Sequence, residues 1–338
     1  MERKPGSPSV VQTRPVLGII EALSAGLDAA LRHPWLLLIP VLLDMFLWVG
    51  PRMQSPALYR SFEPTLRQLT TTMTSPEARL AAQELGKAVE RFLTQYNLFA
   101  WLSAGLIGVP VVNGGADATL KLVTGSLPSL WQVDSLDGYL LVFVFLTTVG
   151  LFISALFWTM LGDFVRGEPW QAAGWLRRSL GVWKKLLLLT IVVVGLALMS
   201  IFPLSMVMFT ISAVSAGLAS IVPLLVVAVA AWIVLVCLFT PHGLVLYQMT
   251  LSRAVSTSSM IVRANFAATV GLAVIAMAIS IGTGLIWEWV AADSWLRLIA
   301  MAGNALVGTG LIVASLLFYR NRVTLLFESH RWPLPAGS

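Results

Sequence analysis

The chain has 338 residues, of which 57% are hydrophobic and 11% are charged, whereas soluble domains carry roughly 25% charged residues. This composition excludes a water-soluble globular protein and indicates an all-α integral membrane protein. The formal net charge is +6, but most basic residues lie beside apolar runs, so we expect no nucleic-acid partner. The single cysteine, Cys237, excludes an intrachain disulfide and a cysteine metal cluster.

The N-terminal part of the chain combines a tail, a surface helix and a first span. Residues 1–15 are polar and proline-rich, which predicts a disordered cytoplasmic tail. Residues 16–50 begin with apolar residues at helical spacing, which predicts an amphipathic helix on the membrane surface. The apolar run Pro34–Gly50 follows, and its 17 residues predict a short span.

The segment 51–137 is the one sizeable non-membrane region, with seven basic and seven acidic residues. Ser75 and Pro76 form a helix-start signature, and apolar residues repeat at helical spacing after them. We therefore predict a helical extracytoplasmic insertion after the first span. Within it, Leu98–Val112 is apolar but only 15 residues long and interrupted by glycine and proline, which favours a re-entrant or interfacial segment over a span.

Residues 138–325 contain five further apolar runs that we predict to cross the membrane, and residues 326–338 are predicted to form a cytoplasmic tail. The five runs are Tyr139–Leu161, Leu186–Phe209, Ile221–Thr240, Phe266–Trp289 and Leu298–Tyr319. Together with the first span they give six transmembrane helices, arranged as three hairpins.

An amphipathic stretch precedes each of the three hairpins. The clearest is residues 170–183, where apolar positions share one helical face. We predict that this helix lies on the membrane surface and contacts anionic lipid headgroups, at about 1 kcal/mol per basic residue. Its basic residues are Arg177, Arg178, Lys184 and Lys185. Two interpretations stay open for the threefold pattern: a true internal repeat, or a similarity that surface helices produce in any membrane protein.

The distribution of basic residues predicts the orientation of the chain. With six spans both termini share one side, and the short segments on that side hold fourteen Lys and Arg residues. The short loops on the opposite side hold one, Arg297. Because short cytoplasmic segments are enriched in Lys and Arg, we predict that both termini are cytoplasmic.

Asp44 is the first candidate functional residue. It lies roughly ten residues past the start of the first span, near mid-membrane, where a carboxylate costs about 2.5–3.5 kcal/mol. It is therefore either a proton- or cation-handling group, a catalytic acid, or a structural residue that hydrogen-bonds to a neighbouring span.

Two further polar residues are candidates. Asn304 lies in a stripe of small residues in the sixth span, where it is either a hydrogen-bonding contact between helices or part of a substrate path. His242 lies at a predicted cytoplasmic membrane edge and is either an interfacial residue or a lone ligand. The histidine spacings match no metal site, and no nucleophile or phosphate-binding motif is present, so we predict no catalytic residue, metal or cofactor.

Four stretches carry a family resemblance: PWLLLIPVLLDMFLW, NLFAWLSAGLIGVP, SSMIVRANFAATVGL and AGNALVGTGLIVASLLFYRNR. In these the chain resembles a group of uncharacterised bacterial multi-pass membrane proteins. That group is loosely similar to the membrane domain attached to some glycerophosphodiester phosphodiesterases. The resemblance implies a bacterial plasma membrane, and it carries over no active-site residue because the chain has no phosphodiesterase domain.

These observations favour a non-enzymatic membrane protein that acts as an accessory or assembly partner, with the lipid bilayer and another membrane protein as its partners. The alternative is a permease or lipid-handling protein with a path between hairpins that includes Asp44. An intramembrane enzyme is the third hypothesis. A two-aspartate intramembrane protease would pair Asp44 with Asp163, but Met160 stands at the first glycine of the required Gly-x-Gly-Asp motif.

Overall fold

The computed structural model describes residues 16–73, 75–103, 107–113, 130–214, 216–291 and 294–330. Within these ranges the chain is almost entirely helical, and its only strands are β1 (Arg52–Gln54) and β2 (Leu130–Gln132). The helices are α1 (Ile19–Arg32), η1 (Pro34–Leu37), α2 (Leu38–Val49), α3 (Pro56–Thr72), α4 (Pro76–Thr94), η2 (Leu98–Leu102), α6 (Leu136–Arg166), α7 (Ala172–Val214), α8 (Ala216–Cys237), α9 (Thr240–Leu246), α10 (Leu251–Ala264), α11 (Phe266–Glu288) and α12 (Leu296–His330). The predicted tail at residues 1–15 and the end of the other, 331–338, lie outside the described residues.

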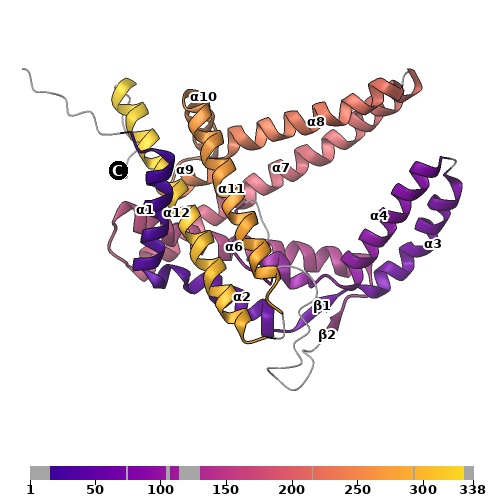
Figure 1. Cartoon of the computed structure of the whole chain (residues 1–338), viewed down its shortest axis with the longest axis horizontal. Coiled ribbons are helices and arrows are strands. Elements are labelled where there is room, and N and C mark those ends of the chain that lie inside the picture. The colour runs from indigo at the N-terminus through magenta and orange to yellow at the C-terminus, as the bar shows by residue number, and fades with distance from the viewer. Residues whose placement is uncertain are drawn as a thin grey trace, which may run out of the picture.

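Five of the six predicted spans coincide with helices that are long and apolar enough to cross a membrane. They are α6, α7, α8 together with α9, α11 and α12 (Figure 1). The sixth candidate is α1 together with η1 and α2, which meets the same criteria only as a pair and is bent by 92° at the break. The all-α class is therefore confirmed, with five or six helices long and apolar enough to cross a membrane.

Helix α1, which the sequence predicts as a surface helix, packs along α12. The backbone N–H of Leu17 donates to Oδ1 of Asn321 at 3.0 Å, and further along α1 Leu27 contacts Gly310, so the two helices are antiparallel. Their backbones approach closely because Gly26 has no side chain. A Cβ there would lie 2.3 Å from the backbone oxygen of Gly310, in the middle of the predicted sixth span.

Helix α7 is longer and more continuous than the sequence predicts. It is one continuous helix, so the predicted break between a surface helix at 170–183 and a span that begins at Leu186 is absent. The indole N–H groups of Trp175 and Trp183 donate to backbone carbonyls of α6 at 3.2 and 3.1 Å. The apolar face of this segment is therefore bound in part to α6 rather than to lipid.

The distal part of α7 and helix α8 form a hairpin that projects away from the body of the protein (Figure 1). Its large apolar side chains are exposed, among them Met199 at 76%, Phe202 at 75% and Leu224 at 70%. None of the side chains described in α8 is buried. We refer to this element as the α7–α8 hairpin.

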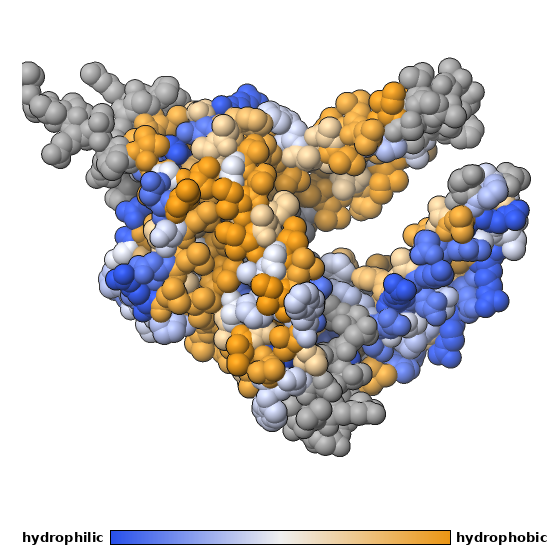
Figure 2. All heavy atoms as spheres, in the orientation of Figure 1, coloured by the Kyte–Doolittle hydropathy of each residue, from blue (hydrophilic) through white to orange (hydrophobic). Residues whose placement is uncertain are grey.

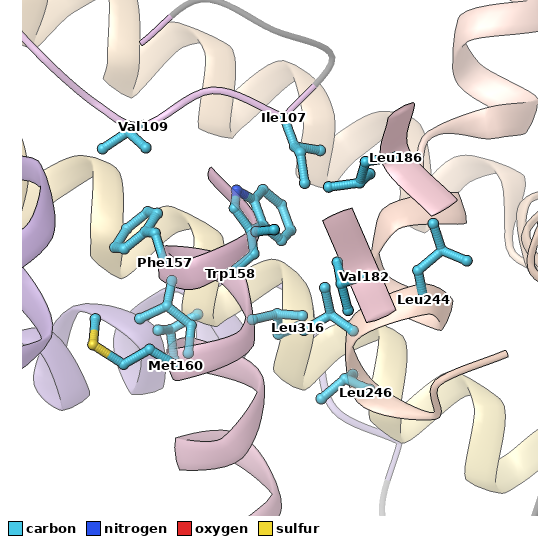
Figure 3. Close-up of a cluster of buried hydrophobic side chains, with 14 of the residues drawn as sticks. Ile107, Val109, Phe157, Trp158, Met160, Val182, Leu186, Leu244, Leu246 and Leu316 are labelled. Carbon is cyan, nitrogen blue, oxygen red and sulfur yellow. The ribbon is translucent and has the colours of Figure 1, made fainter. Parts of the chain in front are cut away.

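The buried core lies where α6, the start of α7, α9 and α12 meet (Figure 3). The segment predicted to be re-entrant or interfacial, Leu98–Val112, contributes Ile107 and Val109 to this core. Its described residues form the short helix η2 and then irregular backbone. The segment packs against α6 at Gly150, where a Cβ would lie 2.6 Å from the carbonyl oxygen of Trp101.

Residues 51–137 contain a second helical hairpin, formed by α3 and α4. The hairpin is joined to the body through the parallel pair of β1 and β2, in which Met53 lies opposite Trp131. The backbone N–H of Ser55 also donates to the carbonyl of Leu93 at 2.9 Å, which closes the base of the hairpin. In Figure 1 this α3–α4 hairpin and the α7–α8 hairpin both extend from the same side of the body.

The close approach of α1 to α12 gives a first prediction. Gly26→Ala should lower the thermal unfolding midpoint in detergent, because overpacking of this kind costs about 1–3 kcal/mol. Gly195→Ala in α7 is the matched control, since a Cβ at that position meets nothing within 4 Å. Equal midpoints for the two variants would contradict the described packing of α1.

Candidate functional site

Asp44 lies in α2 and is 1% exposed. Its Oδ1 accepts hydrogen bonds from the backbone N–H and the side-chain Nδ2 of Asn113, both at 2.8 Å. Its Oδ2 accepts from the backbone N–H of Val112, also at 2.8 Å. Three N–H donors thus point at one carboxylate, which is the arrangement that an acceptor-only, ionised group requires.

Asn113 connects this carboxylate to a cation. Its Oδ1 accepts from Nε of Arg297 at 2.9 Å, so one side chain donates to the anion and accepts from the cation. Arg297 also donates to the carbonyls of Trp287 and Val290, at 3.2 and 3.1 Å, and to that of Val112 at 3.4 Å. We call Asp44, Val112, Asn113 and Arg297 the Asp44 cluster.

The geometry of the Asp44 cluster bears on whether Asp44 is a functional or a structural residue. Both carboxylate oxygens have donors, and Asp44, Asn113 and Arg297 are all buried. The partners come from the irregular segment after η2 and from the start of α12, rather than from the middle of a neighbouring span. The arrangement fits a structural carboxylate better than one that handles ions.

His242 lies in α9 and is enclosed by aromatic rings. The rings of Phe239, Trp158 and Tyr319 have centroids 5.2, 5.4 and 5.6 Å from the imidazole. Nε2 lies 2.8 Å from Oγ of Ser315, whose hydroxyl already donates to the backbone at 2.7 Å. The Ser315 hydroxyl thus lies within hydrogen-bond distance of both the imidazole and a backbone carbonyl.

The Nδ1 atom of His242 is buried and has no hydrogen-bond partner among the described residues. The hydroxyl of Tyr319, in the same ring cluster, is also buried without one. Within the described part of the chain no group of three or more His, Cys, Asp or Glu side chains could hold a metal ion. His242 is thus a buried core residue.

Asn304 lies in α12 and is half-buried. Its side chain makes no hydrogen bond to any residue in the described ranges. The predicted role as a hydrogen-bonding contact between helices has no partner within the described part of the chain. Asp44, His242 and Asn304 do not form one site, since each has different neighbours.

The four basic residues of α7 fall into two groups. Arg178 and Lys185 are half-buried: Arg178 pairs with Asp163 at 2.6 Å, and Lys185 donates to the carbonyl of Gln248 at 2.8 Å. Arg177 and Lys184 are exposed. Arg177 and Lys184 are thus the more exposed half of the predicted basic surface, and Arg178 and Lys185 also bind the chain itself.

A second ionic network, the Asp163 cluster, lies at the turn between α6 and α7. Asp163 is buried and pairs with both Arg166 and Arg178, and Glu168 pairs with Arg166 at 2.7 Å. Arg166 also donates to the carbonyls of Val245 and Leu246 at the end of α9, at 2.8 and 3.0 Å. Asp163 therefore has partners entirely separate from those of Asp44, and the two carboxylates do not form a catalytic pair.

Sequence reasoning alone misses Asn113, Arg166 and Arg297. Arg297 has a visible signal, because it is the one basic residue in the short loops on its side of the predicted topology. Asn113 has none, since its two polar partners are 69 and 184 residues away in the chain.

Comparisons with protein-family models, with curated proteins and with solved structures give no match.

The Asp44 cluster gives a second prediction. Asp44→Asn should lower the thermal unfolding midpoint, because the new amide NH₂ must face one of the three N–H donors. A buried donor without an acceptor costs about 1–3 kcal/mol. Asp28→Asn is the control, since Asp28 is exposed and pairs with Arg32 on the surface of α1. Equal midpoints for Asp44→Asn and Asp28→Asn would contradict the structural role of Asp44.

Two adjacent arginines give a third prediction. Arg178→Gln should lower the unfolding midpoint, since it removes charged hydrogen bonds worth about 1.5–3 kcal/mol before allowance for partial exposure. Arg177→Gln should change the free energy of unfolding by less than about 0.5 kcal/mol, as for other exposed positions. If both residues acted mainly as lipid contacts, the two variants would unfold at the same temperature.

Proposed function

We propose that the protein is a non-enzymatic multi-pass protein of the bacterial plasma membrane that acts as an assembly partner for another membrane protein. The observation that carries this proposal is the α7–α8 hairpin. It contributes little to the core: from α7 only Val182 and Leu186, near its base, belong to the buried cluster. Among the described side chains of its distal part, at 191–207 and 221–234, none is buried.

Helices in a bilayer are stabilised by packing against other helices, since lipid tails are as apolar as leucine side chains. The body of the protein follows this rule, because α1, α6, α9 and α12 pack closely on one another. The distal part of the α7–α8 hairpin does not. At the base of α8, Trp232 packs near Phe266 of α11 with ring centroids 6.0 Å apart, and the hydroxyl of Ser258 donates to the carbonyl of Val236. Beyond that base, the described side chains of the hairpin are left to lipid or to the helices of a partner. A partner that packs on both faces would complete the hairpin.

The proposed orientation places both termini in the cytoplasm and the α3–α4 hairpin outside. The support is the imbalance of Lys and Arg between the two sides. The one basic residue on the opposite side, Arg297, is buried among hydrogen bonds to the chain itself, so it weighs little against this orientation. Arg177 and Lys184, both exposed, are proposed to contact anionic headgroups on the cytoplasmic face.

The resemblance to uncharacterised bacterial membrane proteins, and loosely to the membrane domain of glycerophosphodiester phosphodiesterases, supports only the bacterial plasma membrane as the proposed location. A permease with a path through Asp44 is disfavoured, because the carboxylate is packed and fully hydrogen-bonded. An intramembrane protease is disfavoured because Asp44 and Asp163 belong to separate clusters. Lipid handling keeps one specific observation in its favour, an apolar groove beside the α3–α4 hairpin.

Site-specific photo-cross-linking tests the assembly proposal as a fourth prediction. A photoreactive side chain at Val227 in α8 should form an adduct of discrete protein mass in intact cells. The same side chain at Val144 in α6 should not. Both valines lie on candidate spans and are similarly exposed, at 65% and 60%. Mass spectrometry of the adduct then identifies the partner. Adducts with lipid alone at Val227 would contradict the proposal.

A further inference from the structure

The α3–α4 hairpin has two grooves of opposite character between its helices. One groove runs between α3, α4 and the start of α6, has a volume of about 410 Å³, and exposes only apolar surface. Its walls are formed by Leu58, Phe62, Thr65, Leu66, Val89, Phe92, Leu93, Leu136, Tyr139 and Leu140. We call it the apolar groove. No charged side chain lines it.

The other groove, on the opposite side of the same two helices, is lined by charged and polar residues. They include Glu63 and Arg67, which pair at 2.6 Å, and the cation Lys87, which pairs with Glu84 at 2.8 Å. The side chains of Arg67, Lys87 and Glu84 are largely exposed, and that of Glu63 is half-buried. Hydrophilic residues gather on the outer side of this hairpin, whereas the coloured part of the visible face of the α7–α8 hairpin is mostly hydrophobic (Figure 2). The charged side chains on one side of the α3–α4 hairpin therefore need contact with water, whereas the apolar groove on the other side does not.

The apolar groove continues onto the surface of a candidate span. Leu136 and Leu140 line the groove at the start of α6, and they are 48% and 49% exposed. The next exposed apolar residues of α6 are Leu141, Val144 and Phe145, which lie on a helix long and apolar enough to cross the membrane. A hydrocarbon chain lying against α6 would thus enter the apolar groove without crossing a polar surface.

We propose that the apolar groove binds an acyl chain of a phospholipid from the adjoining leaflet. The α3–α4 hairpin would then lie at the boundary between hydrocarbon and water, with its charged groove in water, as amphipathic helices do at membrane interfaces. A volume of this size is typical of clefts for small apolar ligands, about 300–1,000 Å³. A hydrocarbon chain needs no polar partner, whereas a peptide or a headgroup would find no charge in the groove to pair with.

This inference goes beyond the assembly proposal and does not rest on it. The assembly proposal depends on α7 and α8, whereas the acyl chain would contact α3, α4 and α6. Failure of one leaves the other standing.

Quenching by lipid tests the proposal on the full-length protein. In a Cys237→Ser background, Phe62→Cys places a fluorophore in the apolar groove and Arg67→Cys places one in the charged groove. Each labelled protein is reconstituted into phosphatidylcholine and phosphatidylglycerol vesicles with and without brominated acyl chains. We expect several-fold stronger quenching by brominated chains at position 62 than at 67, and the reverse order for aqueous iodide.

Three results would overturn the proposal. Equal quenching by brominated chains at both positions would mean that the groove does not select hydrocarbon. Protection of position 62 from both quenchers would mean that a protein, either a second copy or a partner, covers the groove. Stronger iodide quenching at position 62 than at 67 would mean that water fills it. Leu140→Cys, on the α6 wall, repeats the measurement so that the result does not depend on one substitution.

Discussion

The carboxylate of Asp44 and the guanidinium of Arg297 form hydrogen bonds with backbone N–H and C=O groups that have no partner within a helix. The segment after η2 enters the body as irregular chain, and its N–H and C=O groups have no regular partners. In a membrane each unpaired backbone group costs several kcal/mol, so irregular backbone survives there only when protein groups pair with it. Asp44 accepts from the N–H groups of Val112 and Asn113. Arg297 donates to the carbonyl of Val112 in this segment and to that of Trp287 near the end of α11.

The rest of the body depends on this arrangement because the irregular segment fills the space between helices. Ile107 and Val109 belong to the core, and Trp158 of α6 donates to the carbonyl of Gly108 at 3.4 Å. Without Asp44 the segment would lose the acceptors for its backbone. The charge in the bundle is therefore explained by support of the chain's own backbone, and it needs no substrate to account for it.

Other cations of the protein also pair with backbone carbonyls, in this case at helix ends. The last carbonyls of a helix lack intrahelical partners and attract cations. Arg166 donates to the final carbonyls of α9, Arg320 donates to that of Val165 near the end of α6, and Lys185 donates to that of Gln248 just beyond α9. Several cations that a charge count assigns to the membrane surface are thus bound to helix ends. A charge count reports which side a residue lies on, and it does not report what the side chain contacts.

The sequence predicts what depends on local composition and misses what depends on contacts between distant residues. The apolar runs correctly predict five helices that are long and apolar enough to cross a membrane, because length and hydropathy are local properties. The continuous course of α7 is missed, since the tryptophans of residues 170–183 pack on α6, and amphipathic periodicity looks the same for a helix on lipid or on protein. Arg177 and Arg178 are adjacent and chemically equal, so only the position of Asp163 distinguishes their roles.

The depth of Asp44 follows from its neighbours rather than from its place in the apolar run. Arg297 lies at the start of α12, where the predicted sixth span begins, and Trp48 and Trp295 meet edge to face with ring centroids 6.4 Å apart. Tryptophans concentrate where a bilayer meets water. On the predicted topology we therefore expect the Asp44 cluster near a membrane boundary and not at mid-depth, where a carboxylate is most costly. The bend of 92° between α1 and α2 fits this position, because α2 is too short to cross a bilayer along its own axis.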